Sequence, residues 1–555
     1  MTTTLLAVFL LMGQQPSPGP LDKAVEEFKV QTKNLGLRAD SPVRQGAAGQ
    51  SRMVWHGRLF ENFRNDFLDA VPHEILQRGG SKGLLRRNQF GLNVSGPVFI
   101  PHLYHGGRTT FFSFSYEGMR ETIARSYLHT IPTMPERSGD WSPVVDQAGQ
   151  MLPIFDPATT APNPAFDPAQ PVSPGNLEYT RAPFAGNRIP ASRFDPVSRQ
   201  QLQYYPAPNS DAGPFFRNNY FILAPERNRA GGVIARLDHT LRERHRLSSS
   251  LNFSNGVDGA APWFPTIANP GPLSRDRRSR RLSIEHVFTL SPRSVNTLTL
   301  EAATNQTANQ PNLDQQGEAF PLYRFQPYLS MGASYPVSRS ARHTYQVSNG
   351  YSTRWGQHRL RAVLVGVQEQ ANSFWPQYPS GQYRFSAGLT SLPGIVNTGH
   401  AFATFLLGGA EYAERSVVTS PSYFRHTRGI LALRDQWEVR PGLTLSLGLN
   451  LELTTPRVEK YDRQSTISFS QINPANGLPG ALAVAGLGGF GRAFQPAIWS
   501  PEQTIGIAWN VLGSTRTVAR VNYAHTFSPL PLYQGQFGTQ AFNGTRTWIS
   551  RNPQL

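Results

Sequence analysis

The chain has 555 residues, a formal net charge of +17 and no cysteine, which excludes disulfides, thiol catalysis and thiolate metal sites. It is too long for one ordinary soluble core, and its 49 glycines and 46 prolines disfavour a helical bundle and favour an all-β chain with long loops. The basic residues are scattered and form no recognisable nucleic-acid motif, so we expect no nucleic-acid partner. Anionic lipid, lipopolysaccharide phosphates and acidic ligands remain as partners for the positive charge.

The N-terminal segment contains the only strongly apolar run, Leu5–Met12. A helix that spans a bilayer needs about 20 residues, so this run is too short to cross a membrane and instead resembles the core of a signal peptide. We therefore predict a signal peptide over 1–20 and a polar linker over 21–52. Any membrane span elsewhere in the chain would have to be built from strands.

Strand-like patterns begin at Val54 and continue through 86–101 and 108–120, with a turn predicted at Gly106-Gly107. Residues 121–230 differ, because they are rich in proline and turn dipeptides and show little periodicity. A loop of this length is abnormal in a compact soluble domain. We therefore predict a long loop insertion over 121–230 that acts as a lid, a plug or a binding surface.

Five hairpins are predicted from residue 231 onward, each with two strands around a tight turn. The connections between them are much longer, and tight turns at one end with long loops at the other are typical of a transmembrane barrel. In a β-sandwich, turns would recur every 8 to 12 residues or so without this asymmetry. The predicted hairpins are 233–241 with 247–253, 282–290 with 295–302, 344–355 with 360–368, 430–439 with 443–453, and 504–511 with 517–527.

The stretch LTLSLGLNLEL, at the return strand of the fourth hairpin, has leucine at every second position. A strand sends alternate side chains to opposite faces, so the leucines share one face while Asn450 and Glu452 share the other with Arg434 and Gln436 of the partner strand. The leucines indicate a stripe that faces lipid, with the polar residues facing the water-filled lumen of a barrel. Alternatively, they form the core of a soluble sandwich. The predicted lipid-facing residues are Leu443, Leu445, Leu447, Leu449, Leu451 and Leu453.

An aromatic residue stands just ahead of the tight turn in four of the hairpins. Rings at one common height favour an interfacial girdle at the edge of a bilayer, whereas the alternative is again a sandwich core. The predicted interfacial aromatics are Phe288, Trp355, Trp437 and Trp509.

Several ordered stretches point to a known family. They are WHGRLFENFRNDFLDA (55–70), RNQFGLNVSGPVFIP (87–101), TTFFSFSYEGMR (109–120), IPTMPERSGDWS (131–142), IFDPATT (154–160), PFAGNRIPASRFDPV (183–197), YYPAPN (204–209), GHAFATFLLG (399–408) and LRDQWEVRPGLTLSLGLNLELTTP (433–456). With them the chain resembles the β-barrel part of TonB-dependent outer-membrane receptors, in the Oar-like group that often carries a carboxypeptidase-regulatory-like domain. The resemblance covers about residues 53–530.

The resemblance implies an exported receptor or transporter in a Gram-negative-type cell outer membrane, which binds or imports a small-molecule, peptide or oligosaccharide ligand. We therefore predict an all-β, antiparallel up-and-down transmembrane β-barrel over 53–555 with long extracellular loops. Outer-membrane transporters of this kind have about 22 strands, whereas about 13 are predicted here, so the barrel is expected to be incomplete. No plug segment is found before residue 53, which argues against a contact with TonB and suggests a non-transporting fragment.

No catalytic motif, cofactor site or metal site is found, so we expect no enzyme and no cofactor. His102 and His105 lie in a turn without nearby carboxylates, and nothing in the sequence places Glu117 and Glu121 in a shared cleft. Two other functions stay open. One is a structural or adhesive surface protein that binds polysaccharide through residues 121–230, and the other is a secreted soluble all-β carbohydrate-binding protein.

Overall fold

The computed structural model describes residues 54–71, 73, 77, 82–146, 148–210, 217–310, 313–334, 337–511, 517–527 and 538–550. The chain divides into two units, residues 1–54 and 55–555, and the fold described below is that of the second. The predicted signal peptide over 1–20 and the predicted linker over 21–52 lie outside the described residues.

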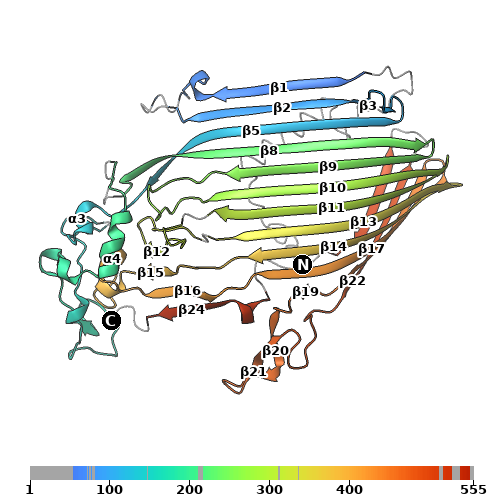
Figure 1. Cartoon of the computed structure of the whole chain (residues 1–555). Coiled ribbons are helices and arrows are strands. Elements are labelled where there is room, and N and C mark those ends of the chain that lie inside the picture. The colour runs from blue at the N-terminus through green and yellow to red at the C-terminus, as the bar shows by residue number, and fades with distance from the viewer. Residues whose placement is uncertain are drawn as a thin grey trace. The chain divides into compact units, whose positions relative to one another are not determined.

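One large antiparallel sheet dominates the second unit, and its strands follow one another in chain order (Figure 1). This confirms the predicted all-β, up-and-down architecture with about 13 strands. A short strand, β19 (Val458–Glu459), pairs with β17 off the main path. The main path runs β1 (His56–Asn65), β2 (Leu85–Pro97), β5 (Thr110–His129), β8 (Tyr220–Arg242), β9 (His245–Asp258), β10 (Ser274–Ser291), β11 (Ser294–Gln310), β13 (Arg339–Trp355), β14 (His358–Phe374), β17 (Ser422–Arg440), β18 (Leu443–Thr454), β22 (Ile498–Asn510) and β23 (Val518–His525).

The strands are longer than predicted at the end of the sheet that carries the long connections. β5 and β8 stay paired as far as His129 and Tyr220, so the loop predicted over 121–230 is confined to 130–219. The other long connections between the predicted hairpins lie at 259–273, 311–338, 375–421 and 455–497. Backbone pairing continues at this end of the sheet without the side-chain alternation that marks a strand in sequence. Both faces are polar at the outer ends of β10 and β11, whereas both faces are apolar over 220–224 of β8.

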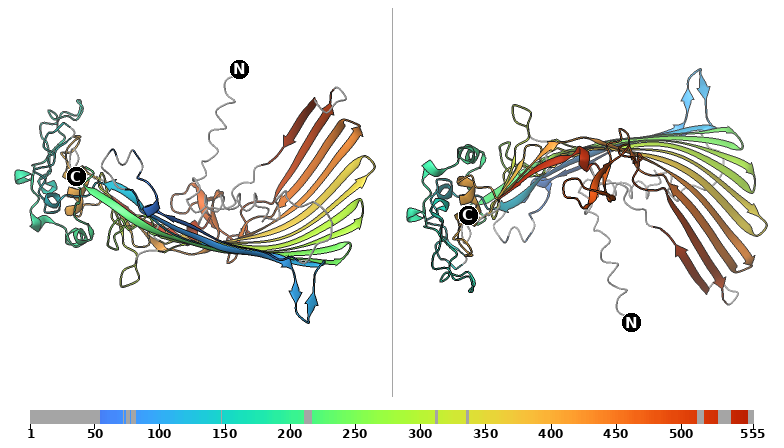
Figure 2. Two further views of the ribbon diagram at one scale, coloured as in Figure 1. Left: turned by 90° about the horizontal axis from the view of Figure 1, so that it is seen from above. Right: turned by 90° about the horizontal axis from the view of Figure 1, so that it is seen from below.

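The turn predicted at Gly106-Gly107 is present, because the N–H groups of Thr109 and Thr110 donate to the carbonyl oxygen of Gly106, but it is only part of the connection. A small hairpin of β3 (Phe99–Ile100) and β4 (Tyr104–His105) projects between β2 and β5, and its turn lies at 101–103 (Figure 2). Gly106 lies after that hairpin, where its N–H donates to the carbonyl oxygen of Val98. The sequence pattern missed the hairpin because two-residue strands carry no periodicity.

The two ends of the large sheet differ as the sequence predicts. Tight turns join β8 to β9, β10 to β11, β13 to β14 and β17 to β18, and all lie at one end. Gly356 and Gly442 adopt positive φ values of 57° and 84° in two of these turns, which glycine accepts without strain. The long connections lie at the opposite end of the sheet (Figure 1).

The alternation of apolar and polar side chains on β18 can be followed onto the other strands through the pairing register. Leu445 lies opposite Trp437 on one side and Ile507 on the other, and directly paired residues share a face. We call the face that carries the β18 leucines the leucine face, and the opposite one the polar face. The leucine face exposes large apolar side chains on most strands, among them Leu237, Leu251, Leu282, Leu300, Val347, Leu364, Leu431, Leu447, Ile505 and Val521.

Burial separates the two faces. Among the described strands of the large sheet, Thr110 is the only buried residue on the leucine face other than glycine. The sheet is curved (Figure 2), and side chains on the concave side of a curved sheet crowd together. The polar face is therefore the concave one. Its buried side chains include Met119, Glu121, Tyr220, Ile222, Ala224, Ser248, Ala303, Val367, Ala371, Ser422, Phe424, His426 and Thr454.

The long connections carry the remaining elements. They form a sheet of β12 (Leu322–Phe325), β15 (Gln382–Phe385), β16 (Tyr412–Val418) and β24 (Gly544–Ile549), and the pairs β6 (Ala161–Pro162) with β7 (Tyr179–Thr180) and β20 (Ser465–Ile472) with β21 (Pro479–Val484). The short helices are α3 (Met134–Arg137), α4 (Pro196–Gln201) and α5 (Ala401–Leu406), with 3-10 turns at 66–68, 157–159, 185–187, 191–193, 202–204, 388–390 and 540–542. No helix in the described part of the chain is both long and apolar enough to cross a membrane.

Candidate functional site: the loop unit and the polar face

Four of the long connections share one buried core at the long-loop end of the sheet (Figure 1). We call residues 130–210, 259–273, 313–334 and 375–410 the loop unit. α5 places Phe402 and Phe405 in the centre of this core, with ring centroids 5.5 Å apart. The same core contains Trp141, Tyr205, Phe264, Tyr323, Phe325, Tyr328 and Phe385.

Hydrogen bonds tie the four connections to one another. The guanidinium of Arg181 donates to the carbonyl oxygens of Leu389 and Ser391, at 2.9 and 2.7 Å. The backbone N–H of Leu329 donates to the carbonyl of Thr130 at 2.8 Å, and that of Gly332 donates to Ala268 at 2.8 Å. Each long connection is thus held by at least one other, so the loop unit is a packed body rather than a set of separate loops.

A buried carboxyl group lies at the start of α3. Glu136 is 1% exposed and accepts hydrogen bonds from the N–H and hydroxyl of Thr133, at 2.6 and 2.8 Å, and from the hydroxyl of Tyr328. Thr133 and Glu136 form a capping box, which satisfies the free N–H groups of the first helical turn. Burial raises the pKa of Glu136, and burial with the nearby carboxyl group also raises the pKa of Tyr328.

His400 lies between two aromatic rings of the core, 4.6 Å from Trp141 and 4.9 Å from Tyr328 between ring centroids. Its Nδ1 accepts the N–H of Phe402 at 3.1 Å and so caps α5. Burial lowers the pKa of His400 to about 3. The ring is therefore a neutral structural cap at ordinary pH.

The polar face carries ion pairs and hydrogen bonds between neighbouring strands. Asp238 accepts from Arg236 at 2.8 Å and from Arg246 at 3.0 Å. Glu121 pairs with Arg87 and also accepts from Asn228 at 3.0 Å. These contacts link neighbouring strands across the polar face.

The polar residues predicted beside the leucine strand lie together on this face. Asn450 donates to Glu502 at 3.1 Å, and Glu452 lies 3.8 Å from Arg428. Gln436 lies opposite Ser446, and Arg434 lies opposite Gly448. Glu117 also lies on this face, where it accepts from Gln89, so it and Glu121 are each engaged by a different partner.

The predicted aromatics lie on the leucine face at its short-turn end. Trp355 pairs with His358, and His358 pairs with Trp437 on the next strand. The rings of His358 and Trp437 are stacked at 5.3 Å, and Phe288 stacks on His245 at 4.2 Å. Trp509 lies opposite Leu443, so the register places all four predicted aromatics and the six leucines on one face.

The β3–β4 hairpin carries both His102 and His105. His102 and His105 are both exposed, and the ring of His105 packs edge-on against Phe99 at 5.2 Å. Among the residues that the structure describes, no group of three or more His, Asp or Glu side chains could hold a metal ion.

The sequence did not predict the loop unit as a body with its own core. Its aromatic residues come from four segments far apart in the chain, and none of these segments shows periodicity by itself. The only local signals were Ser/Thr/Asp residues before short proline-containing turns, such as Thr133 before α3 and Asp195 before α4.

A family model described as "Outer membrane beta barrel domain" matches residues 54–554. No curated protein matches the chain. Solved structures with 10% identity or less are similar over most of this chain, which spans about half the length of the first of them. They include the copper transporter OprC (10% identity, 81% of this chain, 46% of that chain, TM-score 0.37), a mutant of the ferric enterobactin receptor PfeA from Pseudomonas aeruginosa (10%, 86%, 53%, 0.32) and the ferric-catecholate import receptor Fiu from K12 E. coli (8%, 85%, 61%, 0.31). TM-scores of this size carry no argument about function.

Proposed function

Because the chain belongs to the outer membrane β-barrel domain family, we propose that it forms the wall of a TonB-dependent-type receptor that binds a solute and admits it across the outer membrane. The observation that carries the proposal is the asymmetry of the sheet. It has one apolar face and one polar face, with tight turns at one end and long connections at the other. Barrels of this kind place short turns at the periplasmic end and long loops outside the cell.

The two faces have distinct roles in this proposal. The leucine face lies against lipid, with Leu443 to Leu453 as its stripe on β18 and Trp355, Trp437, Trp509 and Phe288 near the periplasmic interface. The polar face lines the path of the solute, with Asn450, Glu452, Arg434 and Gln436 among its lining residues. The alternation along each strand supports both assignments, since it separates the two chemistries without exception on β18.

The loop unit supplies the outer ligand-binding surface. Its packed core holds four connections in one arrangement, and a preformed surface loses less conformational entropy when a ligand binds. The solved structures that are similar in part to this chain include a copper transporter and a receptor for ferric enterobactin. A small-molecule, peptide or oligosaccharide ligand fits the proposal equally.

The edges of the sheet set a further requirement. In the described residues β1 pairs with β2 and β23 pairs with β22, and neither has a second partner. Lipid offers no hydrogen-bond partners to an open strand edge, so a membrane-embedded wall needs further strands along β1 and β23. Import driven by TonB would be a property of that complete barrel.

Reconstitution tests the proposal. Because the edges of β1 and β23 need further strands, we expect the chain to enter lipid vesicles as part of a closed assembly, and the polar path of that assembly should give a measurable conductance or solute uptake. A folded monomer that stays soluble at high salt without detergent would contradict the membrane assignment.

A structural or adhesive surface protein is the second candidate, and the packed core of the loop unit favours it. An adhesin would need that surface but no open path. Vesicles that bind polysaccharide through the loop unit and remain impermeable would favour adhesion over import.

A further inference from the structure

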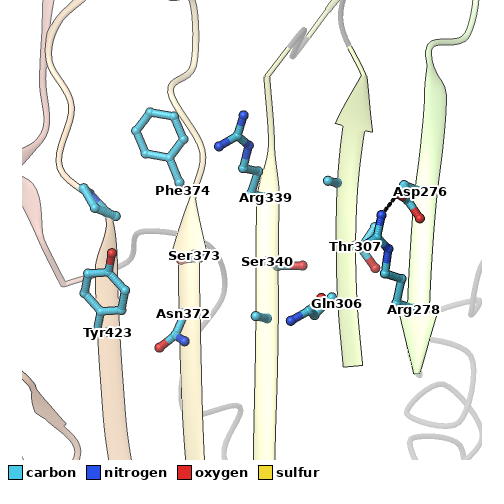
Figure 3. A pocket seen from close by; sticks show the side chains of 13 residues that line it. Asp276, Arg278, Gln306, Thr307, Arg339, Ser340, Asn372, Ser373, Phe374 and Tyr423 are labelled. Atoms are coloured by element: carbon cyan, nitrogen blue, oxygen red, sulfur yellow. Dashed lines mark hydrogen bonds and ion pairs between the residues drawn. The ribbon is translucent and has the colours of Figure 1, made fainter. Parts of the chain in front are cut away.

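Two neighbouring hollows lie on the leucine face, towards the long-loop end of β10, β11, β13, β14 and β17. The upper hollow has a volume of about 520 Å³, and Arg278, Arg339, Asn372 and Tyr423 are among its lining residues (Figure 3). The lower hollow has a volume of about 450 Å³ and is lined mainly by apolar side chains. These include Leu282, Ile284, Leu300, Tyr345 and Val347.

The pairing register places one hollow directly above the other. Arg278 lies opposite Gln306 in the upper hollow, and Leu282 lies opposite Ala302 in the lower hollow. Between them runs a single row of leucine-face residues. That row is Arg280, Thr304, His343, Gln370 and Arg425. The two hollows therefore form one continuous surface that changes from apolar to basic over a few residues of strand.

The upper part of this surface is positively charged. Arg278 pairs with Asp276 at 2.8 Å, which neutralises one arginine (Figure 3). Arg280 lies over the ring of Phe253, at 5.8 Å from its centroid, and Arg339 stands at the rim of the hollow. In the described residues no carboxylate lies within ion-pair distance of Arg280 or Arg339. Their charge is thus available to an anion.

We propose that this surface binds one diphosphorylated lipid of the outer leaflet, with one phosphate at Arg280, the other at Arg339 and an acyl chain in the lower hollow. The inference rests on the proposed function, because it needs the leucine face to lie in the membrane. Basic side chains beside an apolar surface are the arrangement that lipid head groups recognise. Gln306, Asn372 and Tyr423 offer hydrogen bonds to the hydroxyl groups of a sugar head group.

The surface lies on the leucine face, and this position favours a lipid over a transported solute as its ligand. Both hollows are lined chiefly by residues of the leucine face, whereas the proposed solute path follows the polar face. Glu301 borders the lower hollow, but strand alternation directs its side chain to the polar face, where it lies 3.5 Å from Arg281. No charged side chain therefore faces the acyl chain.

Native mass spectrometry of the whole chain released from detergent tests the proposal, with diphosphoryl lipid A as the probe. We expect one retained lipid per chain. The double variant R280Q/R339Q should bind it about 30-fold more weakly, through the loss of two arginine–phosphate attractions. G366L should weaken binding as well, because a Cβ at Gly366 meets open space and the added side chain would fill the lower hollow.

The matched control is R359Q/R361Q, which removes the same charge from exposed arginines on the polar face of β14 and should leave lipid binding unchanged. Equal binding by the wild type and R280Q/R339Q would overturn the inference, as would equal binding of a dephosphorylated lipid A. Displacement of the lipid by inorganic phosphate alone would overturn the assignment to a lipid. A chain that inserts into vesicles yet fails these tests leaves the proposed function intact, whereas a soluble monomer contradicts both.

Discussion

Arg181 and Ser391 are joined by a buried hydrogen bond of 2.7 Å, from a guanidinium nitrogen to a backbone carbonyl, although 210 residues separate them. The same nitrogen also donates to the carbonyls of Gly388 and Leu389. One side chain thus satisfies the carbonyl groups of a 3-10 turn in another connection. This contact shows how the long connections become one body without long helices or strands.

Arg181→Met should therefore loosen the loop unit. The variant keeps an apolar stem but leaves buried carbonyl groups without their donor, at a cost of about 2–3 kcal/mol. Hydrogen exchange should report it as faster exchange of the Phe155 amide, which donates to Thr390 beside this turn. Arg188→Met is the matched control, because the Arg188 side chain is 65% exposed and its ion pair with Asp140 should contribute little. Equal exchange in both variants would contradict the role of Arg181.

The lipid-facing assignment of β18 predicts unequal effects on its two faces. Leu447→Arg should cost about 2–4 kcal/mol of stability in a bilayer, because Leu447 is central in the leucine stripe. Ser446→Arg should cost little, since Ser446 lies on the polar face opposite Gln436. Unfolding by denaturant in lipid vesicles measures both values. A larger loss of stability for Ser446→Arg than for Leu447→Arg would contradict the assignment of the leucine face to lipid.

The aromatic girdle predicts a shallow position in the bilayer. Trp355, Trp437 and Trp509 should be quenched by lipids brominated close to the head group more than by lipids brominated at the chain end. Each Trp→Phe variant should remove part of that shallow quenching. Trp548 is a suitable control, since it is exposed on β24 of the small sheet, and its removal should leave the quenching unchanged. Deep quenching of all three would rule out an interfacial girdle.

His400 predicts a loss of loop-unit stability in acid. The unfolded chain takes up a proton near the ordinary pKa of 6.5, whereas the folded chain resists protonation down to about 3. The stability is therefore complete above pH 6.5 and falls as the pH drops towards 3, by up to about 1.4 kcal/mol per pH unit. Proteolytic susceptibility of the loop unit across this range measures the effect.

The His400→Gln variant isolates that effect. Glutamine keeps an acceptor for the N–H of Phe402 but does not titrate, so the acid limb should flatten. Glu136 contributes with the opposite sign, because burial raises its pKa and its stabilising effect is present at low pH and lost as the pH rises. An unchanged acid limb in His400→Gln would show that another group controls it.

Much of the large sheet could be predicted from local pattern. The tight turns at 242–245, 291–294, 355–358 and 440–443 were found because glycine, proline and charged residues interrupt alternating strands there. The outer ends of β5 and β8 were missed because the apolar–polar alternation stops there, with apolar side chains on both faces of β8 over 220–224. The β3–β4 hairpin was missed because its strands are too short to show a period.

The sequence by itself determined which residues share a face, since side-chain alternation in a strand depends only on neighbours one and two positions away. It therefore predicted the leucine stripe, the aromatic row and the order of the strands. Only the tertiary structure decided that the polar face is the crowded one, that Phe325, Phe402 and Tyr205 meet in one core, and that Arg280 lies between a basic and an apolar hollow. These relationships join segments tens to hundreds of residues apart, and they depend on register and loop packing, which no local pattern records.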